Sequence, residues 1–304
     1  MKNTALYRAI LAEYPLLDYE KNRENEGHIS LVEESERFDI TKGVTYIQRR
    51  YRLGNGRETD VYLVTVAPDA KVQLASSVAP LRKVRMIKRH VTEFPGKVLF
   101  AMNAGFFHYF NGGDLTPYGM QVMHGAVIAE PGDKEKPWYT NHWVGSLKDG
   151  TPVIADAEEY FSEYYGKVAY AVGGGLTLIR NGEITLHNDP DFDPRTAVAK
   201  AKDGTLILLC ADGRAKRSAG LTYGDMIELV LGLGYEIETL LNLDGGGSTT
   251  VVLTDEEGKP YIKNVPSGPP IPISYTKYDL FKPEPEGELM ARAVADCLLL
   301  IEKE

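Results

Sequence analysis

The chain has 304 residues and a formal net charge of -9, with 43% apolar and 25% charged residues. These fractions are typical of a globular protein, and the acidic balance argues against a nucleic-acid partner, because binding to a phosphate backbone requires clustered Lys and Arg. No apolar run is long enough to span a membrane. The two cysteines, Cys210 and Cys297, lie in apolar runs and indicate buried free thiols rather than a disulfide framework.

Residues 1–41 are predicted to form an N-terminal helix and a surface extension. Asn3 or Thr4 can cap a short amphipathic helix, and the polar stretch from Glu20 to Glu36 is typical of a surface connection. The start of the chain has no signal-peptide pattern. A cytoplasmic protein is therefore expected from the chain as written, and an extracellular or cell-envelope protein if a leader has been removed.

Residues 42–304 are predicted to form a single domain of many short strands and few helices. The first two strands, 44–51 and 60–66, flank Gly54-Asn55-Gly56, which favours a hairpin. Later patterns predict further strands at 72–77, 98–102, 170–173, 176–180, 205–211, 240–243, 251–253 and 290–301, and helices at 81–91 and 222–233. Because strands and helices do not alternate regularly, we expect an α+β fold with mixed, largely antiparallel sheets.

A loop rich in glycine and aromatic residues occupies positions 108–119. It is too apolar for a simple linker and too rich in glycine for a helix, and loops of this length are usually functional or disordered. Sugar faces stack on aromatic rings, so we expect residues 108–118 to form one wall of a ligand pocket. His108 can reach a ligand from this loop, although a structural role is the alternative, as it is for His124.

The stretch from Leu240 to Leu253 is the most informative part of the chain. An apolar run ends at Asp244, and three glycines (245–247), three hydroxyl side chains and a second apolar run follow. This pattern predicts strand, tight turn and strand, with the Asp244 carboxylate at the turn. Glycines allow close approach of a ligand, and exposed N–H groups in such a turn can bind an anion, with Ser248 as a further donor. A plain hairpin with an aspartate in its turn is the alternative.

Asp212 and Glu228 are further carboxylates in positions that suit a site. Asp212 follows the strand 205–211 and precedes Arg214, and an Asx turn with a surface arginine is the alternative. Glu228 lies near the apolar face of the helix 222–233. It is either a buried carboxylate with a perturbed pKa or an ordinary residue of the helix surface.

Arg195 is a candidate for binding phosphate. It follows Pro194 at the start of a strand, so a rigid element presents its guanidinium. A guanidinium can bind the two non-bridging oxygens of a phosphodiester at once. An ion pair with Asp191 or Asp193 is the alternative.

Taken together, these motifs resemble the phosphodiester glycosidase family over residues 42–302. The resemblance is carried, in this order, by residues 103–107, 173–175, 194–197, 212–214 and 242–248, with 264–267 and Arg292 later in the chain. Two positions depart from the family pattern. Ala199 stands where the family usually has glycine, and Ala291 stands where it commonly has glutamate, which leaves the role of Arg292 open.

The resemblance implies a hydrolase that cleaves a sugar-1-phosphodiester, such as a diester of N-acetylglucosamine-1-phosphate, to free sugar and a phosphomonoester. Bacterial carbohydrate and exopolysaccharide metabolism are the expected settings. The expected catalytic residues are Asp244, Asp212 and Glu228. The expected substrate-binding or phosphate-binding residues are Asn103, Gly105, His108, Gly174, Arg195, Thr196, Arg214, Gly245, Gly246 and Ser248. For Asn103, satisfying the N–H groups of its own loop is the alternative.

The alternative function is a catalytically silent module that binds a sugar phosphate or takes part in assembly of cell-envelope polysaccharide. In either case the expected partner is a small-molecule or polysaccharide sugar phosphodiester. No metal motif stands out. The acids at 189, 191 and 193 alternate as in a calcium loop but lack its remaining spacing, so a bound divalent cation such as calcium is compatible with the sequence without being required.

Overall fold

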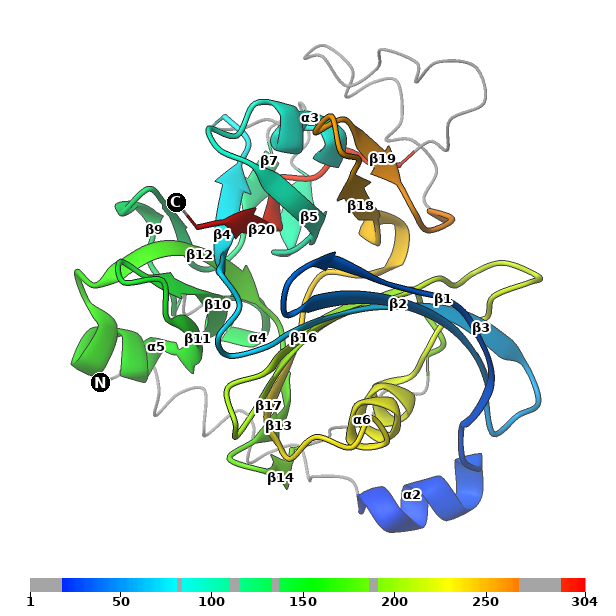
Figure 1. Cartoon of the computed structure of the whole chain (residues 1–304). Helices are drawn as coiled ribbons and strands as arrows, with labels where there is room; N and C mark the ends of the chain where they lie inside the picture. Colours follow the sequence, from blue (N-terminus) through cyan, green and yellow to red (C-terminus); the bar gives the residue numbers. More distant parts are fainter. Residues whose placement is uncertain are drawn as a thin grey trace.

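The computed structural model describes residues 18–80, 84–109, 115–132, 137–185, 191–267 and 291–303 (Figure 1). Its largest element is an eight-stranded sheet in which neighbouring strands are antiparallel. In spatial order the strands are β1 (Ser30–Thr41), β2 (Val44–Arg52), β3 (Glu58–Val66), β16 (Leu206–Ala211), β15 (Arg195–Ala201), β17 (Ile237–Asn242), β13 (Thr177–Arg180) and β14 (Glu183–Ile184).

Two five-stranded sheets and a hairpin make up the remaining strands of the described residues. The β10 sheet contains, in order, β11 (Pro152–Asp156), β10 (His142–Leu147), β12 (Val168–Gly174), β8 (Gln121–Met123) and β9 (Ala126–Ala129). The β5 sheet contains β19 (Pro260–Ile262), β18 (Val251–Thr254), β5 (Val98–Asn103), β20 (Asp296–Glu302) and β4 (Val72–Val78). The hairpin pairs β6 (Phe107–Tyr109) with β7 (Leu115–Pro117). The predicted α+β class with largely antiparallel sheets is confirmed.

The helices of the described residues are few and short. They are α2 (Tyr19–Glu26), α3 (Ile87–Thr92), α4 (Pro137–Thr140), α5 (Ala157–Glu159) and α6 (Tyr223–Leu231), with a π-helical turn at Tyr160–Tyr164 and a 3₁₀ turn at Gly246–Ser248. Helix α6 begins with a capping box. The Thr222 hydroxyl accepts from the N–H of Asp225, and the Asp225 carboxylate accepts from the N–H of Thr222.

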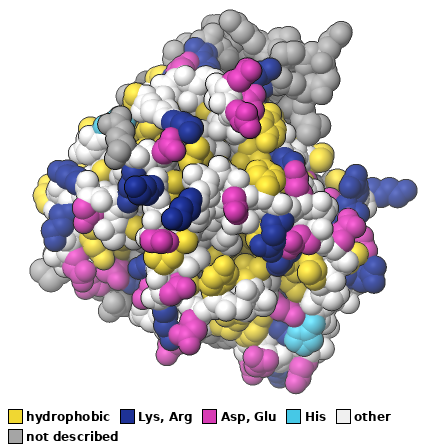
Figure 2. Space-filling model, in the orientation of Figure 1, with side chains coloured by type: hydrophobic (Ala, Val, Ile, Leu, Met, Phe, Trp, Pro, Cys, Tyr) yellow, Lys and Arg dark blue, Asp and Glu magenta, His cyan; other side chains and the backbone are white. Residues whose placement is uncertain are grey.

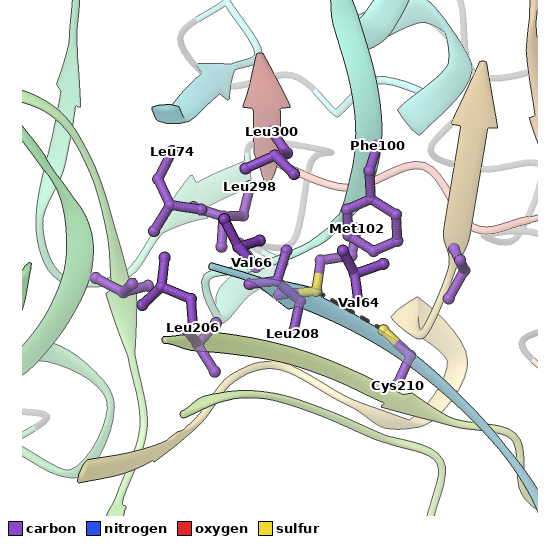
Figure 3. Packing of buried hydrophobic residues seen from close by; sticks show 14 of the residues in the cluster. Val64, Val66, Leu74, Phe100, Met102, Leu206, Leu208, Cys210, Leu298 and Leu300 are labelled. Atoms are coloured by element: carbon purple, nitrogen blue, oxygen red, sulfur yellow. Dashed lines mark hydrogen bonds between the residues drawn. The ribbon is translucent and has the colours of Figure 1, made fainter. Parts of the chain in front are cut away.

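The main hydrophobic core lies between the eight-stranded sheet and the two five-stranded sheets. Figure 3 shows apolar side chains of β3 and β16 facing those of β4, β5 and β20, with the Cys210 sulfur 3.8 Å from the Met102 sulfur. Side chains alternate along a strand. Leu206 and Leu208 therefore enter this core, whereas Ile207 belongs to a second core that α6 covers from the opposite face (Figure 1). Both cysteines are buried and free.

The structure corrects the interpretation of the N-terminal region. The stretch Glu20–Glu36 is more than a surface connection, because it contains most of α2 and half of β1, and β1 pairs with β2. Its charged, mostly exposed side chains suit an edge strand, which packs little of its surface and is protected by charge from pairing with other chains. The predicted division at residue 41/42 falls in the turn of this hairpin and stays a prediction. The helix expected at Asn3 or Thr4 lies outside the described residues.

Two further expectations change in extent. The helix predicted at 81–91 is formed by Ile87–Thr92, with residues 81–83 outside the described range. The closing strand predicted at 290–301 begins at Asp296, because residues 291–295 meet the segment after β4 in a single isolated bridge among the described residues, between Val294 and Arg85. The predicted aromatic loop contains the β6–β7 hairpin in its described part.

The surface carries charges of both signs. On the face shown in Figure 2, Lys and Arg side chains are interspersed with Asp and Glu. Within the described ranges, the structure has no helix of the length and apolar character that crossing a membrane would require.

A buried arginine attaches α2 to α6. Arg23 is 1% exposed, and its guanidinium lies 2.9 Å from a carboxylate oxygen of Asp225 and 2.7 Å from one of Glu228. Removing one partner of a buried ion pair leaves an uncompensated charge, at a cost of about 3–5 kcal/mol. We expect Arg23→Leu to lower the free energy of unfolding by an amount of that order in chemical denaturation.

Arg37→Leu is the matched control. Arg37 also binds a carboxylate, that of Glu34 at 2.6 Å, but its side chain is 49% exposed. An exposed pair contributes about 0–1 kcal/mol. Equal losses for the two variants would show that the Arg23 pair does not anchor α2.

Candidate functional site

The glycine segment 245–247 carries the chain from one sheet to another. Strand β17 lies in the eight-stranded sheet and β18 in the β5 sheet, so the predicted strand, turn and strand are present without forming a hairpin. The crossing is tight. A Cβ at position 245 would lie 2.5 Å from the carbonyl oxygen of Pro194, and one at Gly246, where φ is 59°, would lie 3.0 Å from the Arg214 guanidinium. Glycine is needed here for close packing.

Three backbone N–H groups of this crossing bind within the protein. Gly246 donates to the carbonyl of Pro194 at 2.8 Å, Ser248 to that of Gly245 at 3.1 Å, and Thr249 to that of Gly246 at 3.3 Å. These bonds argue against an open anion-binding concavity built from these three amides. These three N–H groups are therefore not available to an anion in this structure.

Asn103 holds the crossing in place. Its Nδ2 donates to the carbonyl of Asp244 at 2.5 Å, and its Oδ1 accepts from the Thr196 hydroxyl at 3.0 Å and from the N–H of Thr250 at 3.1 Å. Asn103 and Thr196 are both fully buried. This geometry favours the structural alternative for Asn103, and it uses Thr196 in the same network.

The Asp244 carboxyl is the candidate reactive group. The residue is partly exposed, and its N–H donates to the carbonyl of Ala104 at 2.8 Å, so its backbone is fixed at both ends. Burial raises the pKa of the carboxyl to about 7. The Ser248 hydroxyl and the charge of Arg292 oppose this shift, and the charge of Asp296 adds to it. Ser248 lies beside the carboxyl without forming a hydrogen bond of good geometry. A carboxyl that titrates near neutrality suits proton transfer.

A second carboxylate, Asp296, was missed in the sequence. It is fully buried at the start of β20, where it accepts from the N–H of Gly105 at 2.6 Å and from the Gln121 side chain. Burial raises the pKa of Asp296 to about 6, although both hydrogen bonds favour its ionised form. The only indication of Asp296 in the sequence is its position directly before the apolar run 297–301. Gly105 is required because a Cβ there would lie 2.6 Å from this carboxylate.

Asp212 is a structural carboxylate in this structure. It is 2% exposed and accepts three hydrogen bonds, from Asn264 at 2.9 Å, from the Tyr62 hydroxyl at 2.8 Å and from the N–H of Val265 at 3.0 Å. Burial raises its pKa to about 6 against these bonds. A carboxylate with its oxygens used in this way ties β16 to the segment after β19 and is poorly placed to act on a substrate.

Glu228 also has structural contacts. Its carboxylate lies 2.7 Å from Arg23 and 2.9 Å from His28, and it accepts from the N–H of Ile29 at 3.2 Å. These contacts anchor the N-terminal segment to α6, and the described residues around Asp244 are not among them. These contacts favour a structural role for Glu228, because the helix turns its side chain toward α2, and the predicted catalytic role stays a prediction.

The two predicted phosphate-binding arginines differ in how they are held. The Arg195 guanidinium is 9% exposed, donates to the carbonyls of Leu221 and Asp191, and lies 4.3 Å from the Tyr223 ring centre. Arg214 is half exposed over Gly246, and its Nε donates to Asp193 at 2.8 Å. The expected alternative for Arg195 was an ion pair with Asp191 or Asp193, and the structure shows a hydrogen bond to the backbone carbonyl of Asp191 instead. Arg214 presents an open guanidinium face.

A series of aromatic rings runs from Phe106, beside Gly175, to the exposed His108. Phe106 lies 4.7 Å from Tyr139, Tyr139 stacks with Tyr118 at 6.2 Å, and Tyr118 stacks with the exposed His108 at 6.1 Å. The described part of the predicted aromatic loop therefore joins a ring series. Gly174 lies at the inner end, where a Cβ would lie 2.7 Å from the Leu241 side chain, so its role is close packing.

Several buried polar atoms at this site have no hydrogen-bond partner among the described residues. They are Asn242 Oδ1, Ser248 Oγ, Thr249 Oγ1, Gln121 Oε1 and Arg292 Nε. Leaving one such group unpaired costs about 1–3 kcal/mol, and native structures contain few of them. Their concentration around Asp244 and Asp296 is typical of a surface built for a polar ligand.

The described residues contain no cluster of three or more His, Cys, Asp or Glu side chains arranged to hold a metal ion. Of the alternating acids, Asp189 lies outside the described residues, and Asp193 binds Arg214.

The sequence of this chain is similar to those of known proteins. The family model described as "Phosphodiester glycosidase" matches residues 96–300, more than half of the chain. The mouse protein named N-acetylglucosamine-1-phosphodiester alpha-N-acetylglucosaminidase is 29% identical over 181 residues, which cover 53% of this chain and 33% of the mouse protein. The human protein of the same name is 28% identical over 50% of this chain and 31% of its own length. The chain thus spans about a third of these curated relatives.

A solved structure supports the fold. The zebrafish N-acetylglucosamine-1-phosphodiester alpha-N-acetylglucosaminidase catalytic domain, auto-inhibited by its pro-peptide, superposes with a TM-score of 0.61 at 20% identity. The match covers 96% of this chain and 95% of that one. A hypothetical protein from Synechocystis gives a TM-score of 0.54 at 15% identity over 90% of this chain and 64% of that one. At these identities the likeness concerns the fold alone.

The raised pKa of Asp244 predicts a pH-dependent stability difference. The folded protein keeps a proton on this carboxyl up to about pH 7, whereas the unfolded chain releases it near 3.8. The contribution of this carboxyl to stability is therefore present at low pH and lost as pH rises through this window. Asn cannot ionise, so we expect the stability of Asp244→Asn relative to wild type to increase with pH across the window in denaturant titrations.

Asp149→Asn is the control for this experiment. Asp149 is exposed, and the N–H of Thr151 lowers its pKa below the ordinary value of 3.8. A lowered pKa changes stability only at more acidic pH. The relative stability of this variant should stay flat across the same window. A flat result for Asp244→Asn as well would contradict the assignment of a buried, proton-retaining carboxyl.

Proposed function

The chain belongs to the phosphodiester glycosidase family, and from this premise we propose that it hydrolyses a sugar-1-phosphodiester to free sugar and a phosphomonoester. The observation that carries the proposal is the Asp244 carboxyl, with a pKa raised to about 7, among buried polar atoms that lack partners. We propose a diester of N-acetylglucosamine-1-phosphate as the substrate class, since relatives that cover half of the chain carry that name.

In this proposal Asp244 acts in its ionised form. It either takes a proton from the attacking water or attacks the anomeric carbon itself, and both roles require a carboxylate. The leaving group is a phosphate ester, which departs as a stable anion and needs little protonation. Asp296 shapes the pKa of Asp244 through its charge and does not itself face the substrate, because both of its oxygens accept hydrogen bonds.

Arg292 is the proposed phosphate-binding cation, with Arg214 as a second. Its charge acts on the Asp244 carboxyl, and its Nε has no hydrogen-bond partner among the described residues. The planar guanidinium can donate to two phosphate oxygens at once. Arg195 is less suited to this task because backbone carbonyls already accept from its guanidinium.

Product identification distinguishes this reaction from its alternatives. The protein is incubated with UDP-N-acetylglucosamine in isotopically labelled water, and the products are identified by mass spectrometry. A phosphodiester glycosidase releases free N-acetylglucosamine with label on the sugar. A phosphoesterase leaves sugar-1-phosphate, and a silent binding module releases nothing while the ligand raises its melting temperature.

Removing the carboxylate should abolish most turnover. We expect Asp244→Asn to lower kcat by roughly 100- to 10,000-fold, the range typical of positioned acid–base groups, with the fold retained. In wild type, kcat/KM should rise with pH and level off above about pH 7, where the Asp244 carboxyl is ionised.

Asp296→Asn tests the electrostatic part of this assignment. It removes a neighbouring negative charge, so the pKa of Asp244 should fall and the acid side of the pH profile should move to lower pH. Asn can still accept from the N–H of Gly105. An unmoved profile would separate Asp296 from the titration of Asp244.

A pair of lysine variants tests the phosphate site. Arg292→Lys keeps the positive charge but cannot donate two parallel hydrogen bonds to a phosphate. We therefore expect kcat/KM for a sugar phosphodiester to fall by roughly 10- to 100-fold, which corresponds to the loss of a charge-assisted hydrogen bond of about 1.5–3 kcal/mol. Binding of free sugar should change little. Arg195→Lys should mainly lower the melting temperature. If Arg195→Lys lowers kcat/KM and Arg292→Lys lowers only the melting temperature, Arg195 is the phosphate-binding residue instead.

A further inference from the structure

The side chain of Asn242 is buried with one hydrogen-bonding atom unused. Asn242 lies at the end of β17, two residues before Asp244, and is 2% exposed. Its backbone is fixed, because its N–H donates to the carbonyl of Leu176 and its carbonyl accepts from the N–H of Gly175, at 2.9 and 2.8 Å. Its Oδ1 has no partner among the described residues.

Tyr223 orients this amide. Its hydroxyl accepts from Asn242 Nδ2 at 3.3 Å, which directs Oδ1 away from α6. The face of the same ring lies 4.3 Å from the Arg195 guanidinium. Tyr223 is the first residue of α6, and the capping box at Thr222 holds that end of the helix. The tyrosine is therefore presented from a rigid position and reaches two side chains of the site.

The surroundings of Asn242 suit a sugar. A Cβ at Gly175 would lie 3.2 Å from Asn242 Nδ2 and 2.9 Å from the Phe106 ring, so both groups occupy the space that this glycine leaves. Phe106 and Tyr223 are only partly buried, and Phe106 continues into the ring series through Tyr139. A polar acceptor beside aromatic faces matches a sugar, which combines hydroxyl donors with apolar C–H faces.

We propose that Asn242 is a substrate-binding residue whose Oδ1 accepts a hydrogen bond from a hydroxyl or amide N–H of the sugar, and that Tyr223 is the positioning residue that holds the amide in this orientation. The proposal rests on the proposed function and deepens it, since it assigns the sugar portion of the substrate to this side of Asp244. The bound donor satisfies the buried acceptor, and the sugar ring packs against Phe106.

Binding of N-acetylglucosamine tests the proposal without turnover. In the Asp244→Asn background, saturating sugar should raise the melting temperature. Adding Asn242→Leu should weaken the affinity by roughly 3- to 10-fold, the value of one neutral hydrogen bond. Tyr223→Phe, which removes one oxygen and keeps the ring beneath Arg195, should weaken it less. Unchanged affinity in both variants would overturn the proposal.

A double-mutant cycle separates positioning from general structural damage. If Tyr223 acts through Asn242, then Tyr223→Phe should add nothing in the presence of Asn242→Leu, so the double variant should bind the sugar as Asn242→Leu does. Additive losses would assign Tyr223 an independent role and overturn its positioning part. If Asn242→Leu does not fold, Asn242→Thr takes its place in the same cycle.

These experiments distinguish failure of the sugar subsite from failure of the proposed hydrolase activity. If the protein binds the sugar through Asn242 but hydrolyses no phosphodiester, the subsite stands and the hydrolase does not. If it hydrolyses the diester while Asn242→Leu leaves KM and sugar affinity unchanged, the hydrolase stands and the subsite does not.

Discussion

The amide of Asn103 joins the parts of this protein that must meet for a site to exist. Asn103 ends β5, and its three hydrogen bonds reach Thr196 in β15, the carbonyl of Asp244 and the N–H of Thr250 before β18. One side chain thus ties a strand of the eight-stranded sheet to the chain that crosses into the β5 sheet. Since Asn103 and Thr196 are fully buried, these bonds are shielded from water, and leaving any of them unmade would be costly.

The hydrogen bonds of Asn103 explain how the Asp244 side chain can be largely buried and still partly exposed to solvent. Its backbone is held from two directions, by Asn103 and by the carbonyl of Ala104, and the glycines after it allow the chain to pass close to Pro194. The carboxyl therefore occupies a defined place, where the Ser248 hydroxyl and the N–H of Gly245 favour its ionised form. Asp212 shows the opposite arrangement, because its oxygens accept hydrogen bonds from three donors.

Two neighbouring carboxyl groups, those of Asp244 and Asp296, carry an electrostatic cost of burial. Burial raises the pKa of Asp244 and of Asp296, and the charge of Asp296 makes ionisation of Asp244 harder. Ionising both near neutral pH requires compensation, which Arg292 supplies in part. A phosphate would add negative charge to the same region. The balance between the charges of Arg292 and Asp296 therefore influences the proton affinity of Asp244.

The sequence alone determined the class of the fold and about half of the strand positions, because hairpin turns and apolar periodicity are local signals. It also singled out Asp244 and the glycines after it as a candidate site, because a carboxylate between a buried strand and three glycines is a local pattern. It could not distinguish Asp244 from Asp212 or Glu228. That distinction depends on which donors other segments bring to each carboxylate, and Asn264, Arg23 and His28 are distant in sequence. Asp296, Gln121 and Tyr223 were missed for the same reason. Only the packing of three sheets around one crossing brings these side chains together, because a hydrogen bond between strands far apart in the chain leaves no periodic trace in either of them.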